Sequence, residues 1–117
     1  MKKRIVLTGG PGGGKTTAID LLRREFSNQI VVVPESATML FSGGIERNDS
    51  PSLIKAQQQA IYNLQKHLEL IQRTKHPDRL MLCDRGSLDG LAYWPDNPDE
   101  FFVYLNTDLK TELAQYD

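Results

Sequence analysis

A cluster of glycines followed by a lysine near the start of the chain has the residue types and spacing needed to bind phosphate. Gly9, Gly14, Lys15 and Thr16 match the pattern G-x-x-x-x-G-K-[ST] without a mismatch. Glycines let main-chain N–H groups approach a phosphate closely. The lysine ammonium suits the β- and γ-phosphates, and the threonine hydroxyl suits Mg²⁺. We predict a P-loop that binds a nucleoside triphosphate, ATP in preference to GTP, through Gly10, Gly12, Gly13, Gly14, Lys15, Thr16 and Thr17.

Acidic and basic residues follow two further apolar runs, 30–33 and 80–83, which we predict to be strands. Ligands of open parallel sheets bind at the carboxyl ends of the strands. Asp84 directly follows the second run, where an acid can hold Mg²⁺ together with Thr16. The alternative for Asp84 is a helix-capping residue in a turn.

Arg85 and Glu35 are the other candidates for catalysis. A planar guanidinium at Arg85 suits a phosphoryl group, whereas the alternative is a plain ion pair with Asp84, Asp89 or Glu35. Glu35 follows the strand predicted at 30–33 and could accept the proton of an attacking hydroxyl. Its alternative is a surface acid that follows a strand.

The elements that must position these residues alternate between strands and helices along the chain. Four apolar runs indicate strands at 4–8, 30–33, 80–83 and 101–105. Helical spacing and capping signals indicate helices at 15–26, ending near 41, at 51–74, at 87–93 and after a cap at Thr107 or Asp108. This alternation predicts an α/β fold with a parallel sheet and right-handed crossovers, formed by one domain that spans 1–117.

The long helix at 51–74 carries a predicted apolar stripe that is interrupted by amides. Gln57 projects into the middle of this stripe and Gln58 onto its edge. A buried amide needs a partner, and either a substrate group or nearby backbone could supply it. The stripe consists of Leu53, Ile54, Ile61, Leu64, Leu68 and Ile71.

Composition limits the partners that we expect. The 117 residues are 39% hydrophobic and 25% charged with a formal net charge of -1, which is typical of a soluble globular domain and gives no reason to expect nucleic acid or an anionic membrane as the main partner. We expect no membrane span, and a cytoplasmic location. The single cysteine, Cys83, permits no intrachain disulfide, and His67 and His76 have no companions suited to a metal.

Three segments together resemble a known group, the P-loop ATPase/kinase-like family typified by the kinase domain of the nicotinamide ribonucleotide regulator and by the TRP-channel-translocation-defect protein. More distantly they resemble thymidylate and deoxynucleoside kinases. The segments are 9–17, 33–35 and 84–93. The resemblance implies a three-layer sandwich with the kinase–GTPase strand order, in which the strand before Asp84 lies beside the P-loop strand. It also implies that Glu35, Asp84 and Arg85 face the acceptor, with Gln58 as an acceptor contact. Relatives continue into an arginine-bearing lid, so we expect this chain to be the N-terminal two-thirds of the usual domain, incomplete on its C-terminal side.

We therefore expect a Mg²⁺-dependent kinase that transfers the γ-phosphoryl of ATP to a small hydroxyl or phosphate acceptor resembling a nucleoside or nucleotide. Its catalytic residues would be Lys15, Glu35, Asp84 and Arg85. The alternative is a regulator that binds ATP or GTP as a switch for a lipid or protein partner. A third interpretation is a chain that is inert without its lid. The sequence leaves the acceptor and the oligomeric state open.

Overall fold

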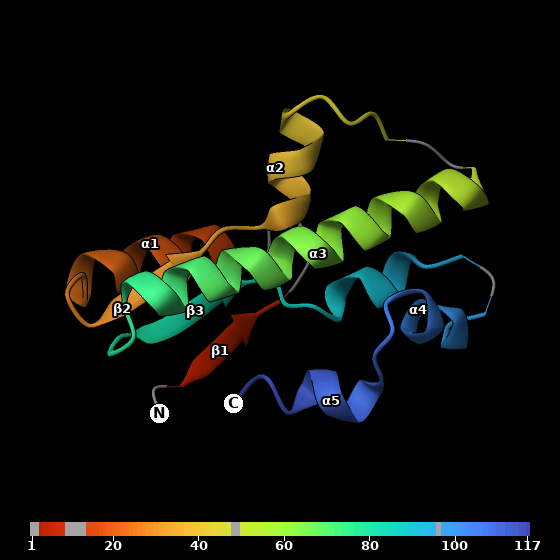
Figure 1. Ribbon diagram of the computed structural model, residues 1–117. Helices are drawn as coiled ribbons and strands as arrows, with labels where there is room; N and C mark the ends of the chain where they lie inside the picture. Colours follow the sequence, from red (N-terminus) through yellow and green to blue (C-terminus); the bar gives the residue numbers. More distant parts are fainter. Residues whose placement is uncertain (1–2, 9–13, 48–49, 96) are drawn as a thin grey trace.

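Three parallel strands form the sheet in a computed structural model that describes residues 3–8, 14–47, 50–95 and 97–117 (Figure 1). The strands are β1 (Arg4–Leu7), β2 (Ile30–Val33) and β3 (Leu80–Asp84), in the order β1-β3-β2. The predicted neighbours are confirmed, because β3, which ends at Asp84, pairs with the strand before the P-loop. Val6 and Val33 both align with Cys83, so the strands end at the same edge of the sheet.

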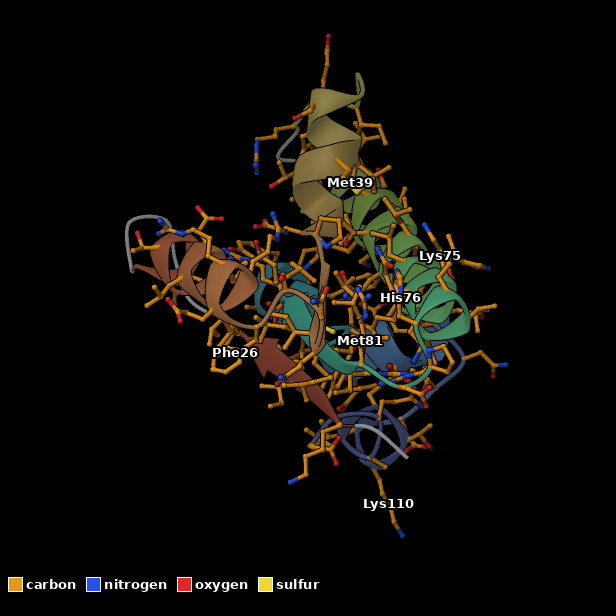
Figure 2. The ribbon with its side chains drawn as sticks, turned by 90° about the vertical axis from the view of Figure 1, so that its left-hand side faces the viewer. Phe26, Met39, Lys75, His76, Met81 and Lys110 are labelled. Carbon is orange, nitrogen blue, oxygen red and sulfur yellow. The ribbon has the colours of Figure 1, made fainter. Side chains whose placement is uncertain are left out.

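Helices cover both faces of this sheet and give three layers. On one face Ile19, of α1 (Lys15–Glu25), packs with Ile30 and Leu82. On the other face Leu68, of α3 (Pro51–Lys75), packs against Val33, Met81 and Cys83. Successive side chains of a strand point to opposite faces. The continuous apolar run of β3 therefore supplies Leu82 to the face covered by α1 and Met81 to the face covered by α3. Figure 2 shows Met81 in the interior, between these two helices.

The remaining elements are short and surround the carboxyl end of the sheet or its β1 side. They are α2 (Ser36–Ser42), η1 (Asp89–Tyr93, a 3₁₀ helix), α4 (Asp99–Tyr104) and α5 (Leu109–Leu113). The Asp108 side chain caps α5 by accepting a hydrogen bond from the Thr111 N–H at 2.7 Å. Of the two caps considered from the sequence, Asp108 is therefore the one used. Among the helices within the described ranges, none combines the length and the apolar character that crossing a membrane requires.

The strand predicted at 101–105 is wrong, because 101–104 lies in the helix α4 and Leu105 is its C-cap. Asp99 and Glu100 occupy the first turn, where negative charge stabilises a helix through its dipole. Only one side of the segment is buried: Phe101 is inaccessible and contacts the Trp94 ring edge-on at a centroid distance of 5.5 Å, whereas Val103 is 77% exposed. The described part of the chain therefore has three strands in its sheet.

The apolar stripe predicted for α3 is wrong at its ends. Leu53 and Ile71 are about half exposed, whereas three polar side chains of α3 are buried. These are Gln58, Gln65 and Glu69. Glu69 is held by Arg4 and Tyr116, and Gln65 donates to the Arg85 carbonyl, so the partners that permit the burial of these two residues come largely from other segments of the chain.

Candidate functional site

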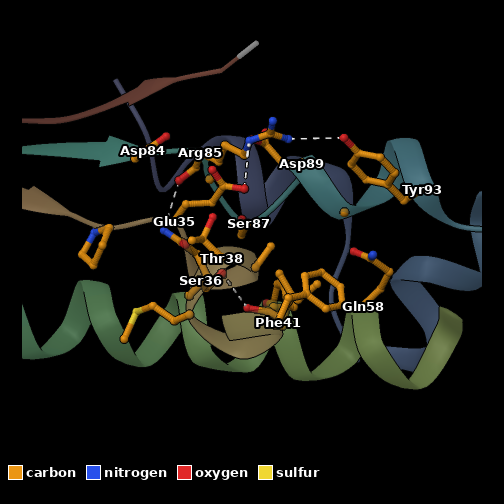
Figure 3. A pocket seen from close by; sticks show the side chains of 18 of the residues that line it. Glu35, Ser36, Thr38, Phe41, Gln58, Asp84, Arg85, Ser87, Asp89 and Tyr93 are labelled. Carbon is orange, nitrogen blue, oxygen red and sulfur yellow. Dashed lines mark hydrogen bonds and ion pairs between the residues drawn. The ribbon is translucent and has the colours of Figure 1, made fainter. Parts of the chain in front are cut away.

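A cavity of about 1030 Å³ opens where β2 and β3 end (Figure 3). Its wall is formed by the first turn of α1, by α2, by the middle of α3 and by the segment from Asp84 through η1. Every catalytic residue predicted from the sequence lies on this wall: Lys15, Glu35, Asp84 and Arg85. The strand ends therefore bring together residues from three separate parts of the chain.

The beginning of α1 faces this cavity and has the backbone of an anion-binding helix terminus. Gly14 precedes the helix with φ 79° and ψ 3°, a left-handed conformation that strains residues with a Cβ. Its carbonyl accepts the first helical hydrogen bond, from the Ala18 N–H at 3.0 Å. Gly14, Lys15 and Thr17 line the cavity. The other predicted phosphate ligands, Gly10, Gly12, Gly13 and the side chain of Thr16, lie outside the described residues.

Lys15 contacts two carboxylates at once. Its ammonium forms an ion pair and hydrogen bond with Asp84 Oδ1, and lies 3.5 Å from Glu35 Oε2. The lysine side chain is only 13% exposed. Asp84 at the end of β3 and Glu35 after β2 can both reach it because neighbouring parallel strands end side by side. The described structure thus pairs the P-loop cation with the predicted metal ligand and the predicted base.

Arg85 extends this chain of charges into the cavity. Its Nε lies 3.5 Å from Glu35 Oε1, so Glu35 bridges the ammonium of Lys15 and the guanidinium. The ion pair between Arg85 and Glu35, left open as an alternative by the sequence, is present. Nη1 of Arg85 also donates to the Tyr93 hydroxyl at 3.4 Å. This hydrogen bond raises the pKa of the guanidinium; burial opposes the effect, and the charges of Glu35 and Asp89 add to it.

The backbone of Arg85 is unusual, with φ at 70°. A residue with a Cβ adopts this left-handed region at a cost of about 1–2 kcal/mol. The Arg85 N–H is held by the Leu7 carbonyl at 2.8 Å, which continues the ladder between β1 and β3 to the point where the chain turns. Such strain persists only where neighbours fix it, and it is concentrated at functional sites.

Asp89 adds a carboxylate to the same wall. Burial raises the pKa of Asp89, and the positive charge of Arg85 counteracts part of this effect. Asp89 lies four residues after Arg85 in the sequence and is the first residue of η1. It therefore places a second acid near the guanidinium, in addition to Glu35.

The far end of the cavity is lined by amides and aromatic rings. Gln58 is buried, and its Oε1 lies 2.5 Å from the position that a Cβ on Gly90 would take. The helices α3 and η1 therefore pack closely at this point. Phe41 on α2 has the Arg47 guanidinium stacked 4.1 Å from its ring centroid. Gln57, which the sequence placed in the middle of a buried stripe, donates to the Glu46 carbonyl at 2.6 Å. Figure 3 shows Gln58, Phe41 and Tyr93 around this space.

Sequence reasoning missed a set of polar residues at and behind the wall. Gln65 lines the cavity, and Glu69, Glu112 and Tyr116 lie behind it. Burial alone would raise the pKa of Glu112, but the hydroxyls of Ser87 and Thr107 and the ammonium of Lys66 together lower it. A signal existed in the sequence: Gln65 and Glu69 follow Gln58 by seven and eleven residues, which places all three on one helix face.

Comparison with known proteins identifies the family of the chain. A protein-family model described as an AAA domain matches residues 4–117, nearly the whole chain. The searches among curated proteins and among solved structures found no match. Members of this family are P-loop proteins that generally bind a nucleotide with Mg²⁺. With its P-loop pattern, its parallel sheet and this match, the chain belongs to the AAA-domain family of P-loop ATPases.

Proposed function

We propose that this protein is a Mg²⁺-dependent kinase that transfers the γ-phosphoryl of ATP to a small acceptor resembling a nucleoside or nucleotide. One observation carries the proposal: a single cavity runs from the beginning of α1 to a space lined by amides and aromatic rings, with Glu35 and Arg85 between the two. A protein that only hydrolyses its nucleotide has no need of a second compartment of this kind beside the phosphate site.

The nucleotide end fits a triphosphate. The first N–H groups of a helix have no partner within the helix, and the dipole favours an anion there. The first N–H groups of α1 follow Gly14, and the first turn of α1 holds no acidic side chain that would compete with a phosphate. Lys15 supplies the positive charge, and its side chain already lies against the cavity wall.

Asp84 and the Thr16 hydroxyl are the residues that would hold Mg²⁺. Within the described ranges there is no group of three His, Cys, Asp or Glu side chains that could bind a metal by themselves. Mg²⁺ usually takes one or two carboxylates from the protein and completes its shell with phosphate oxygens and water, a requirement that Asp84 and Thr16 could meet beside a bound triphosphate. When bound, the ion neutralises charge that develops on the phosphate oxygens.

Lys15, Glu35 and Arg85 have different roles in the phosphoryl transfer. Phosphate oxygens replace the carboxylates around the Lys15 ammonium, which frees Glu35 from one of its two cations. Glu35 accepts the proton of the acceptor hydroxyl as the acceptor oxygen bonds to the γ-phosphorus. The bond from that phosphorus to the bridging oxygen breaks, and ADP leaves with its electron pair. Arg85 stabilises the charge on the transferring group by donating hydrogen bonds.

The chemistry of the far end favours a planar acceptor with hydrogen-bonding edges. The Gln58 amide can both donate and accept, and Tyr93 and Phe101 offer apolar ring surface. Arg47 lies on the same wall and would suit an acceptor that already carries a phosphate.

The test is acceptor dependence. Purified protein is incubated with Mg·ATP and a panel of nucleosides and nucleoside monophosphates, and both ADP and phosphorylated acceptor are measured. We expect product only with certain acceptors and none from Lys15→Ala. ADP release that no acceptor stimulates, without phosphorylated product, would refute the kinase and favour a nucleotide-binding regulator.

A further inference from the structure

A buried polar network extends from the cavity wall, where Gln65 lies, towards β1 and the C-terminal segment, and it has no part in the mechanism above. Its centre is the Glu69 carboxylate on α3, whose side chain is 2% exposed. Three donors surround it: Arg4 Nη1 at 3.0 Å, Gln65 Nε2 at 2.7 Å and the Tyr116 hydroxyl at 2.7 Å. A buried carboxylate held by a cation and two neutral donors is a rigid anchor, because moving any partner leaves a buried charge unsatisfied.

Two members of this network also hold the turn that carries Arg85. The same Gln65 amide nitrogen donates to the Arg85 carbonyl at 3.1 Å. The Tyr116 hydroxyl accepts from the Ser87 N–H at 2.9 Å. The two backbone groups on either side of Gly86 are thus both tied to residues that bind Glu69.

The middle of the turn is fixed by packing. A Cβ on Gly86 would lie 3.0 Å from Val6 Cγ2 and 3.2 Å from Tyr116 Cζ, so the backbone there fits closely between β1 and the C-terminal segment. Tyr116 is itself held in place, because the next residue, Asp117, exchanges hydrogen bonds with the Arg4 backbone at 2.7 and 2.8 Å. The turn therefore has little freedom to move.

The direction of the Arg85 side chain depends on this turn. With φ at 70°, Arg85 lines the cavity and its guanidinium contacts Glu35 and Tyr93. If the carbonyl of Arg85 lost its partner, the backbone could relax towards negative φ, which residues with a Cβ prefer. The guanidinium would then lose its orientation.

We infer that Gln65 is a positioning residue, which holds Arg85 in its left-handed conformation and so directs its guanidinium towards the site of phosphoryl transfer. The inference about transfer rests on the proposed function, whereas the inference about orientation concerns the protein alone. Gln65 donates from one amide group to both the anchor and the turn, a role that an apolar side chain of the same length cannot fill.

The test compares Gln65→Met with Thr107→Val. The first keeps the length of the side chain and removes both hydrogen bonds. The second is a matched control, since Thr107 donates to another buried carboxylate, Glu112, at 2.7 Å and does not line the cavity. In the protein without nucleotide, the ¹H–¹⁵Nε signal of Arg85 is followed by NMR and assigned by its loss in Arg85→Lys.

We expect the Arg85 signal to shift or broaden in Gln65→Met and to stay unchanged in Thr107→Val, although both variants unfold at lower temperature. Tyr116→Phe, which keeps the ring and removes the other tie to the turn, should change the same signal, and it provides the test if Gln65→Met does not fold. An unchanged signal in the folded Gln65 variant, or in its Tyr116 substitute, would overturn the inference, as would an equal change in Thr107→Val.

A kinetic arm uses an acceptor identified by the panel above. We expect Gln65→Met to lower kcat about tenfold and to leave Mg·ATP affinity within about twofold. In the Arg85→Ala background, the same change should have no further effect on kcat, because a residue that acts through Arg85 is not additive with its removal. A further tenfold loss in that background would overturn the inference. If the unmodified protein transfers no phosphoryl group, the proposed function fails and the NMR comparison alone decides the role of Gln65.

Discussion

Replacing Glu35 with glutamine should affect nucleotide binding and turnover in opposite directions. Glu35 lies 3.5 Å from the Lys15 ammonium, so a nucleotide must compete with this carboxylate for the lysine. At an effective dielectric constant of about 20 the attraction between these charges is about 5 kcal/mol. Desolvation and salt cancel most of it, because Glu35 is partly exposed and shared with Arg85. A net value of about 1 kcal/mol remains, or about a fivefold change in Kd.

We therefore expect Glu35→Gln to bind ATP about fivefold more tightly in EDTA at low salt, and the gain to shrink as salt is added. The same variant should lower kcat about a hundredfold if Glu35 is the proton acceptor. Affinity is measured by isothermal titration calorimetry with and without Mg²⁺.

Two further variants sharpen this experiment. Asp84→Asn also releases Lys15, so it should tighten ATP binding in EDTA but weaken it with Mg²⁺, since Asp84 is the proposed metal ligand. Glu100→Gln is the control. The Glu100 carboxylate lies 3.2 Å from the Lys55 ammonium, and neither residue lines the cavity, so this variant should leave both affinities unchanged. Equal or weaker binding of ATP by Glu35→Gln in EDTA would refute the reasoning that Glu35 competes for Lys15.

Three further predictions test the fold. Phe101→Ala should lower the free energy of unfolding by about 3–5 kcal/mol, whereas Val103→Ala should change it by less than about 0.5 kcal/mol, because α4 buries only one side; urea unfolding measures both. Gly86→Ala should cost about 1–2 kcal/mol in the same assay, since the added methyl group would press against Val6. Burial raises the pKa of the Cys83 thiol to about 12, so the unfolded thiol ionises first and stability should fall as pH rises from about 9 towards 12. At pH 10 the free energy of unfolding is lower by about 1.4 kcal/mol for this reason, and Cys83→Ala should make the dependence of that free energy on pH flatter between about 9 and 12.

Most elements of the sheet and its two covering helices could be predicted from the sequence, because each is a local pattern with a clear end. β1, β2 and β3 each contain a short apolar run that ends at or close to a glycine, a proline or an aspartate, and α3 begins with proline after serine. The segment 101–105 could not be assigned in this way. Its aromatic and β-branched residues favour a strand by propensity, but the packing of Phe101 and the acidic first turn decide for a helix.

The part of the candidate site that lies at the ends of the strands could be predicted from the sequence. Lys15, Glu35, Asp84 and Arg85 each follow a strand or loop whose end the sequence marks, and the parallel order of the strands brings them together. The spacing on α3 could mark Gln65 and Glu69 as sharing a face, but their partners were not predictable, because these partners come from distant segments of the chain. No local pattern links α3 to Tyr116, 51 residues further along the chain than Gln65.

The charges on the cavity wall suggest why nucleotide and acceptor should cooperate. Without ligands, Glu35 is engaged by Lys15 on one side and by Arg85 on the other, so the proposed base and the proposed phosphoryl-binding cation neutralise each other. Triphosphate binding draws Lys15 away and leaves Glu35 with a single cation, which makes its second oxygen available to an acceptor hydroxyl. Because linkage is reciprocal, an acceptor that engages Glu35 must favour the nucleotide by the same factor. Acceptor titrations with and without a non-hydrolysable ATP analogue should therefore give different Kd values, and Glu35→Gln should abolish most of that difference. Equal acceptor affinities in the unmodified protein would show that the bridge through Glu35 does not couple the two ends of the cavity.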